Sequence, residues 1–253
     1  MVQPSLADPD PVPMQVVPYR WRLTPTYLAH LYKAVSQQHH KELIPLLRPL
    51  VPADAVVLDI GAHAGQFAKL FAKLAPEGRV WSFEPGGYAR SILRLALWLN
   101  GAANVTVVPM GLGDGFGIAT LNLPEKRPGS YGFGLAHLGA SETRWARVAA
   151  EPILVGTIDG FVASQGLDRI DFIKADIEGW EAAMLRGGRE TLARFRPALL
   201  LELTGAHLAR AGDTLAGAYA LLRELGYRPH LPDSNGGLVP IEDEREGDIW
   251  WLP

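Results

Sequence analysis

The sequence predicts an α/β domain in which helices cover both faces of one mostly parallel β-sheet. Short apolar runs rich in β-branched residues recur along the chain, as expected of strands that are buried on both faces. A segment with apolar residues at helical spacing follows several of these runs. This alternation of strand and helix favours parallel strands joined by helical connections.

The composition is that of a folded globular protein. Of the 253 residues, 48% are hydrophobic and 20% are charged, which is far from the charge-rich, apolar-poor profile of disordered chains. The formal net charge of -3 gives no surplus of positive charge, so we expect no nucleic-acid partner. The chain contains no Cys, which excludes disulfides, thiolate catalysis and metal sites built on Cys.

Residues 1–50 are predicted to form an N-terminal extension. The Pro-rich run at residues 7–13 cannot propagate a helix and predicts a flexible lead-in. Residues 24–50 carry apolar side chains at helical spacing and predict one or two helices, with His39 and His40 on a solvated helix surface. Neither a secretory signal nor a bilayer-spanning apolar run of about 20 residues is found, so we expect a cytoplasmic location and no membrane partner.

Residues 51–253 are predicted to form the main domain, and its first half follows the strand-helix alternation. The run at residues 55–60 is short, apolar and β-branched, and the apolar face of residues 66–74 predicts a helix after it. The same pattern predicts a strand at residues 79–83, a helix at 89–99 and a strand at 105–108.

The second half of the domain begins with an interruption at residues 123–151. Many Gly and Pro residues occur there, so we expect a long irregular insertion. Buried strands are expected after it at residues 171–175 and 198–203, with a helix at 180–193 between them and another at 215–225. Residues 227–231 and 248–252 predict antiparallel strands at the edge of the sheet. The oligomeric state is left open.

A glycine-containing loop follows the first predicted strand. The strand ends in Asp59, and Gly61 and Gly65 flank Ala62 and His63 before the next helix begins. Glycine lets a backbone turn tightly and approach a ligand, while the free amides of a helix start can face the bound group. The spacing of the two glycines alone is weak evidence for a ligand-binding loop, because any tight strand-to-helix turn can require glycine.

Two further strand ends supply partners for a nucleoside. Glu84 ends the second predicted strand, about 20 residues beyond the loop, where an acidic side chain can accept both ribose hydroxyls. Gly113 and Asp114 follow the third strand, where loop amides and a carboxylate can hold an adenine ring. An open α/β sheet binds its ligands at this carboxyl edge, so the three elements predict one site.

Asp59 favours S-adenosylmethionine over NAD as the ligand of this site. A carboxylate at the base of the loop would repel a pyrophosphate, whereas it suits the ammonium group of a methionine moiety. The third glycine of a dinucleotide-binding motif is also missing. We therefore predict S-adenosylmethionine as cofactor and keep an NAD-linked oxidoreductase as an alternative.

The chain resembles the FkbM-type methyltransferases from about residue 56 to residue 203. A block at residues 173–181 is the most specific part, and an Asn usually stands in that family where this chain has His63. The other similar segments are residues 57–65, 83–85, 104–114, 185–188 and 196–197.

The resemblance implies a Rossmann-like class I methyltransferase fold and transfer of a methyl group to a hydroxyl. The acceptor it implies is a small molecule, such as a secondary metabolite or sugar, or a glycan. Two alternatives stay open at this point. One is N-methylation of a small amine, and the other is a non-catalytic module that binds a nucleoside.

A hydroxyl acceptor requires a base, and four side chains are candidates. Asp176 ends a buried strand at the carboxyl edge, although it could instead cap the following helix. Glu178 lies near the start of that helix, where a carboxylate also stabilises the helix dipole. Glu202 lies in an apolar strand, so it should be paired, neutral or directed into a site, and His207 follows the same strand. No third ligand accompanies Asp176 and Glu178, so we expect no metal site.

Overall fold

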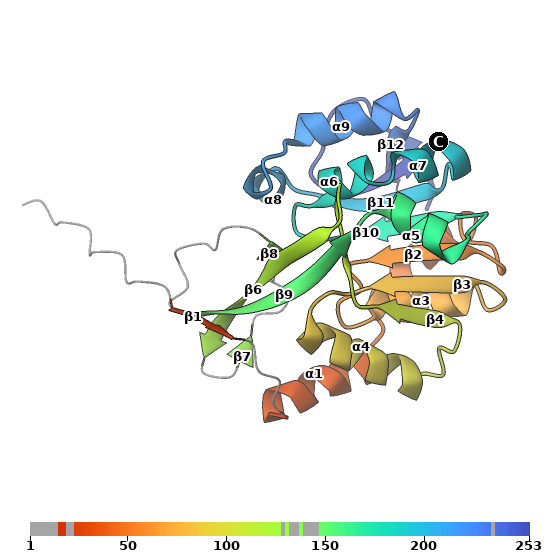
Figure 1. Ribbon diagram of the computed structural model, residues 1–253. Coiled ribbons are helices and arrows are strands. Elements are labelled where there is room, and N and C mark those ends of the chain that lie inside the picture. Colours follow the sequence, from red (N-terminus) through yellow and green to blue (C-terminus); the bar gives the residue numbers. More distant parts are fainter. Residues whose placement is uncertain (1–14, 19–22, 128–129, 132–136, 139–146, 234–235) are drawn as a thin grey trace, which may run out of the picture.

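The computed structural model describes residues 15–18, 23–127, 130–131, 137–138, 147–233 and 236–253. A mixed sheet lies at its centre, with the strand order β13-β12-β14-β11-β10-β2-β3-β4 (Figure 1). The strands from β4 to β11 are parallel, and the strands from β14 outward are antiparallel. The predicted α/β architecture with an antiparallel C-terminal edge is therefore confirmed.

The strands of this sheet follow the predicted runs closely. Its parallel strands are β2 (Val56–Ile60), β3 (Arg79–Phe83), β4 (Val105–Val108), β10 (Phe172–Ala175) and β11 (Ala198–Leu203). Its antiparallel strands are β12 (Arg228–Pro232), β13 (Leu238–Pro240) and β14 (Gly247–Leu252).

Helices cover both faces of the sheet, and each face has its own apolar core. Leu58 and Ile60 of β2 point into the core under α5, α6 and α9, whereas Val57 points into the core under α2 and α3. This alternation follows from the two-residue period of a strand. The helices of the two faces are α2 (Ile44–Leu47), α3 (Gln66–Leu74), α4 (Gly87–Leu99), α5 (Ile158–Gln165), α6 (Glu181–Arg186), α7 (Arg189–Phe195), α8 (Gly205–Arg210) and α9 (Leu215–Glu224).

The helices predicted before the first strand are present. Helix α1 (Pro25–Ser36) is capped by Thr24, whose hydroxyl accepts a hydrogen bond from the backbone N–H of Tyr27, and it packs against α4. A short 3₁₀ helix, η1 (Lys41–Leu43), then leads into α2. The described helices include none that combines the length and apolar character needed to cross a bilayer.

The predicted helix at residues 180–193 is broken into α6 and α7. Gly187 and Gly188 separate the two, and a Cβ atom at Gly187 would overlap the carbonyl oxygen of Gly113. No local pattern in the sequence indicates this long-range contact. Glycine is required there because two backbone segments approach each other closely.

A second sheet extends away from the central one (Figure 1). Its strands β6 and β9 pair antiparallel from Gly117 and Val155 at one end to Pro124 and Val148 at the other. The expectation of an irregular insertion was therefore wrong for residues 123–127 and 147–151, which lie in β6 and β9, whereas residues 128–129, 132–136 and 139–146 lie outside the described ranges. The strands of this sheet are β1 (Gln15–Pro18), β5 (Gly111–Leu112), β6 (Gly117–Arg127), β7 (Ser130–Tyr131), β8 (His137–Leu138) and β9 (Arg147–Gly156).

Candidate active site

A cavity of about 430 Å³ opens at the carboxyl ends of the parallel strands. One side, near β3 and β4, is mainly apolar, and the other side, near β10, β11 and β14, is mainly polar. The apolar side includes Ile60, Ala62, Phe83, Pro85, Met110, Leu112 and Leu121, and a further apolar lining residue, Ile177, follows β10. The polar side includes His40, Gln66, Lys174, Asp176, Glu202 and Asp248.

The loop after β2 is held by hydrogen bonds and by two glycines with positive φ. The backbone N–H groups of Gly61 and Ala62 both donate to the carbonyl of Phe83, at 3.0 and 2.9 Å. Gly61 has φ +76°, and a Cβ atom there would overlap the carbonyl oxygen of Asp176. Gly65, with φ +87°, precedes α3 but does not line the cavity. Gly61 and Ala62, two of the predicted donor-binding residues, do line it.

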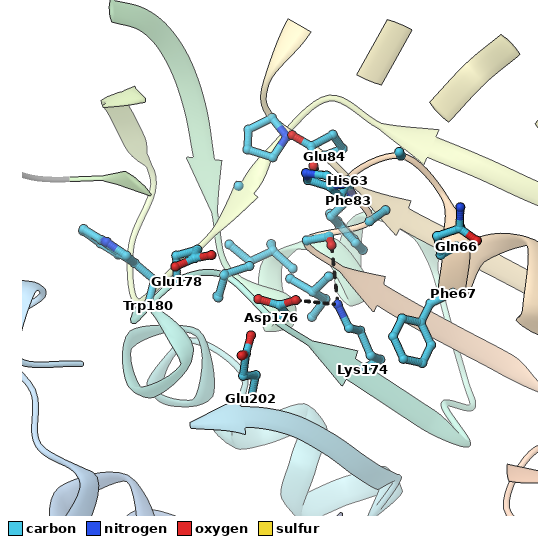
Figure 2. Close-up of a pocket in the computed structure, with 18 of the residues that line it drawn as sticks. His63, Gln66, Phe67, Phe83, Glu84, Lys174, Asp176, Glu178, Trp180 and Glu202 are labelled. Carbon is cyan, nitrogen blue, oxygen red and sulfur yellow. Dashed lines mark hydrogen bonds and ion pairs between the residues drawn. The ribbon is translucent and has the colours of Figure 1, made fainter. Parts of the chain in front are cut away.

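His63 lies in the same loop with its side chain at the cavity (Figure 2). Its φ is +52°, a left-handed conformation in which Asn and His are several-fold enriched. This shared tolerance explains how His can stand where the FkbM-type pattern has Asn. Burial lowers the pKa of His63 to about 4, so the imidazole is neutral at neutral pH.

Glu84 is buried and reaches the cavity from the end of β3. Its Oε2 atom accepts a hydrogen bond from the backbone N–H of His63 at 2.9 Å, and its Oε1 atom accepts one from Gly86 at 2.8 Å. Burial nevertheless raises the pKa of Glu84 to about 7. Each oxygen keeps a further lone pair that can accept a hydroxyl.

Besides Gly65, three predicted donor-binding residues lie outside the cavity lining. Asp59 is fully buried behind the wall, where Ser82 donates to it at 3.3 Å and burial raises its pKa to about 6. Gly113 donates its N–H to the carbonyl of Gly156. Asp114 forms an ion pair with Arg186 at 3.2 Å on the surface. The turn before Gly113 reaches the cavity instead, through Met110, Gly111 and Leu112.

Asp176 and Glu202 meet at the centre of the polar side (Figure 2). Their carboxyl groups are hydrogen-bonded to each other, and Lys174 Nζ lies 3.6 Å from Asp176 Oδ2. Burial acts to raise the pKa of Asp176, but Lys174 and Glu202 outweigh it, and the pKa lies below its ordinary value. The hydrogen bond with Asp176, together with burial, raises the pKa of Glu202 to about 8. At neutral pH the pair therefore holds one proton, on Glu202.

The other two predicted bases form a separate pair. Glu178 lines the cavity with φ +57°, and its Oε2 atom lies 3.1 Å from His207 Nδ1 and 3.7 Å from Arg210 Nη2. Burial and the charge of Asp176 raise the pKa of Glu178 to about 7. His207 is not among the lining residues. The carboxylate that binds backbone N–H groups at the start of α6 is Glu181, which accepts from Ile177 at 2.8 Å.

His40 and Asp248 are among the lining residues that had no predicted role in the site. His40 precedes η1 and its ring stacks on Phe67, with 4.4 Å between the ring centroids, so its assignment to a solvated helix was wrong. Asp248 lies opposite Glu202 in the register of β11 and β14. The predicted edge strand at residues 248–252 could have placed Asp248 beside Glu202. Nothing in the sequence indicates that His40 reaches the cavity.

No group of three or more side chains suited to a metal ion occurs within the described ranges. On the polar side of the cavity, the carboxyl groups of Asp176 and Glu202 are suited to proton transfer. Its apolar side, with Glu84 at its border, is equipped for a nucleoside.

The chain matches the sequence model of one protein family, described as the methyltransferase FkbM domain, over residues 59–229. It is 28% identical over 171 residues to the 2-O-methyltransferase NoeI of Sinorhizobium fredii, covering 64% of this chain and 67% of that one. It is 24% identical over 179 residues to the methyltransferase sdnD of Sordaria araneosa, covering 62% and 67%.

Among solved structures, the chain is similar to the methyltransferase FkbM of Methylobacillus flagellatus, with a TM-score of 0.51 and 17% identity. The similarity covers 89% of this chain but 58% of that one, so this chain spans little more than half of that protein. At this identity the similarity supports the Rossmann-like methyltransferase fold alone.

Proposed function

The chain belongs to the FkbM family of methyltransferases, and from this premise we propose that it is an O-methyltransferase. The reaction would move the methyl group of S-adenosylmethionine to a hydroxyl of a small molecule or glycan. One observation carries the choice of oxygen: Asp176 is an ionised carboxylate at the cavity wall, fixed by Lys174, where a hydroxyl needs a base. The name of NoeI, a 2-O-methyltransferase, supports the same choice.

The residues at the cavity fit S-adenosylmethionine. Glu84 would accept the ribose hydroxyls, because both of its oxygens keep free lone pairs. Met110, Leu112 and Ile177 would enclose the adenine ring in apolar surroundings. The loop from Gly61 would hold the amino-acid end. The cavity volume of about 430 Å³ lies in the range of small-molecule sites.

Bound S-adenosylmethionine supplies an electrophilic methyl group on a sulfonium centre. Asp176 would accept the proton of the acceptor hydroxyl as the oxygen attacks. Lys174 keeps Asp176 ionised, and the proton on Glu202 lets the two carboxyl groups remain in contact without mutual repulsion. Burial of Lys174, with 5% of the residue exposed, strengthens this pairing because water screens it little.

An amine acceptor is the second candidate. Asp176 directly follows β10, while Glu202 and Asp248 lie on the next two strands, and all three line the cavity, which would attract a cation. An amine also needs less help from a base than a hydroxyl does.

The test is transfer of a labelled methyl group. The purified chain is incubated with S-adenosylmethionine carrying a trideuterated methyl, together with a panel of hydroxylated and amine compounds and a fractionated metabolite extract. Mass spectrometry should find products heavier by one labelled methyl, on oxygen. Labelled amines alone would favour the second candidate. Calorimetric binding of S-adenosylhomocysteine without any labelled product would indicate a non-catalytic module, and binding of NAD alone would refute the proposal.

A further inference from the structure

We propose that His40 and Asp248 select the acceptor by binding a hydrogen-bond-donating group, a hydroxyl or an ammonium, at a distance from the reacting atom. This inference rests on the proposed function. It concerns the end of the cavity that lies beyond Asp176 and Glu202.

Both residues lie outside the part of the chain that matches the family model. Among the described residues that line the cavity, His40 and Asp248 are the two beyond residues 59–229. All lining residues suited to the donor, and the Asp176 and Glu202 pair, lie inside that range. Features added around a shared reaction centre are expected to distinguish one family member's acceptor from another's.

The position of Asp248 follows from the sheet. Strand β11 pairs with β10 on one side and with β14 on the other, and Asp248 is opposite Glu202. Neighbouring strands lie about 4.8 Å apart, so β14 is about 10 Å from β10, which Asp176 directly follows. An acceptor whose hydroxyl touches Asp176 would therefore meet Asp248 with a different substituent.

His40 closes the same end from the N-terminal part of the chain. The backbone is left-handed at His40, with φ +62°, and the ring lies flat on Phe67 with an interplanar angle of 17°. Phe67 also contacts Lys174, whose Nζ atom is 5.0 Å from the ring centroid (Figure 2). The imidazole is thus held in place beside the charged groups of the site.

The chemistry of the two side chains is complementary to a hydrogen-bond donor. Asp248 forms no side-chain hydrogen bond or ion pair with any other described residue, so its carboxylate oxygens can accept from a ligand. Burial lowers the pKa of His40, which leaves a neutral imidazole with one accepting nitrogen. The flat ring can also pack against the face of a cyclic acceptor.

The test compares variants on the acceptor identified with the labelled donor. Asp248→Ala and His40→Asn should each raise the KM for that acceptor roughly tenfold, the effect of losing one good hydrogen bond. Asn is chosen because it tolerates the left-handed backbone at position 40. The kcat, the affinity for S-adenosylhomocysteine and the melting temperature should change little. Matched controls are His39→Asn and Asp243→Asn, two exposed neighbours that do not line the cavity.

A third variant, Asp248→Asn, distinguishes an acceptor that presents a hydroxyl to Asp248 from one that presents an ammonium. An ammonium should lose affinity as strongly with Asn as with Ala, whereas a hydroxyl should retain most of it with Asn. An unchanged KM in both Asp248→Ala and His40→Asn would overturn the inference, as would an equal loss of affinity for S-adenosylhomocysteine. Absence of labelled product from the unmodified protein would instead refute the proposed function, and the inference with it.

Discussion

Asp176 and Glu202 are in carboxyl-to-carboxyl contact because Asp176 directly follows β10 and Glu202 lies near the end of the neighbouring parallel strand β11. The surroundings of the two groups differ. Lys174 Nζ approaches Asp176 to 3.6 Å, and Asp248 lies opposite Glu202. The charge therefore stays on Asp176 and the proton on Glu202, which assigns the base of the proposed reaction.

The first prediction concerns Asp176→Asn. Asn has the same shape but cannot take the acceptor proton, so kcat should fall roughly 10²- to 10⁴-fold, the usual contribution of a general base. Calorimetry should show nearly unchanged affinity for S-adenosylhomocysteine. Asp168→Asn, at an exposed acid before β10, serves as the control and should leave kcat unaltered. A kcat for Asp176→Asn equal to that of the control would assign the base to another residue.

The second prediction concerns stability and pH. Since the pKa of Glu202 is raised to about 8 in the folded state from an ordinary value of 4.5, the folded state binds the proton more tightly. The contribution of Glu202 to the free energy of unfolding is therefore largest below pH 4.5, and it is lost as the pH rises from about 4.5 to 8. Urea unfolding at several pH values should show a smaller fall for Glu202→Gln than for the unmodified protein. An identical pH dependence would contradict the assigned protonation.

The third prediction concerns Glu84→Gln and the donor. Loss of a charged hydrogen-bond acceptor should weaken binding of S-adenosylhomocysteine by roughly 10- to 100-fold. Because the pKa of Glu84 is about 7, affinity in the unmodified protein should increase as pH rises through 7, when the carboxylate forms. Calorimetry at pH 6 and pH 8 checks both points. In Glu84→Gln this increase should vanish, and its persistence would place the titrating group elsewhere.

Local patterns sufficed to predict the sheet and part of the cavity lining. Strand β2 was recognisable as a short β-branched run, and Gly61 and Glu84 were found from their places at strand ends. Each of these signals lies within one strand and the turn that follows it. Because parallel strands end at a common edge, such signals predict which residues meet there.

Other features depend on contacts that a local pattern does not contain. Asp114 has the expected place after β4, yet Arg186, 72 residues away, pairs with it outside the cavity. His40 reaches the cavity through a left-handed turn and a ring contact with Phe67. The long pairing of β6 with β9 was missed because Pro124 and the nearby glycines resemble an irregular loop.

The last prediction separates two effects of a glycine at positive φ. Gly61 and Gly101 have φ +76° and +67°, so Ala at either site should cost about 1–2 kcal/mol from backbone strain. At Gly101 a Cβ atom would meet nothing within 4 Å, and Gly101→Ala should show that cost alone. At Gly61 it would overlap the carbonyl oxygen of Asp176, so Gly61→Ala should lose more stability and displace the proposed base. Urea unfolding and kcat measure the two consequences. Equal losses of stability in both variants, with kcat preserved, would show that the loop can move away from Asp176 without harm.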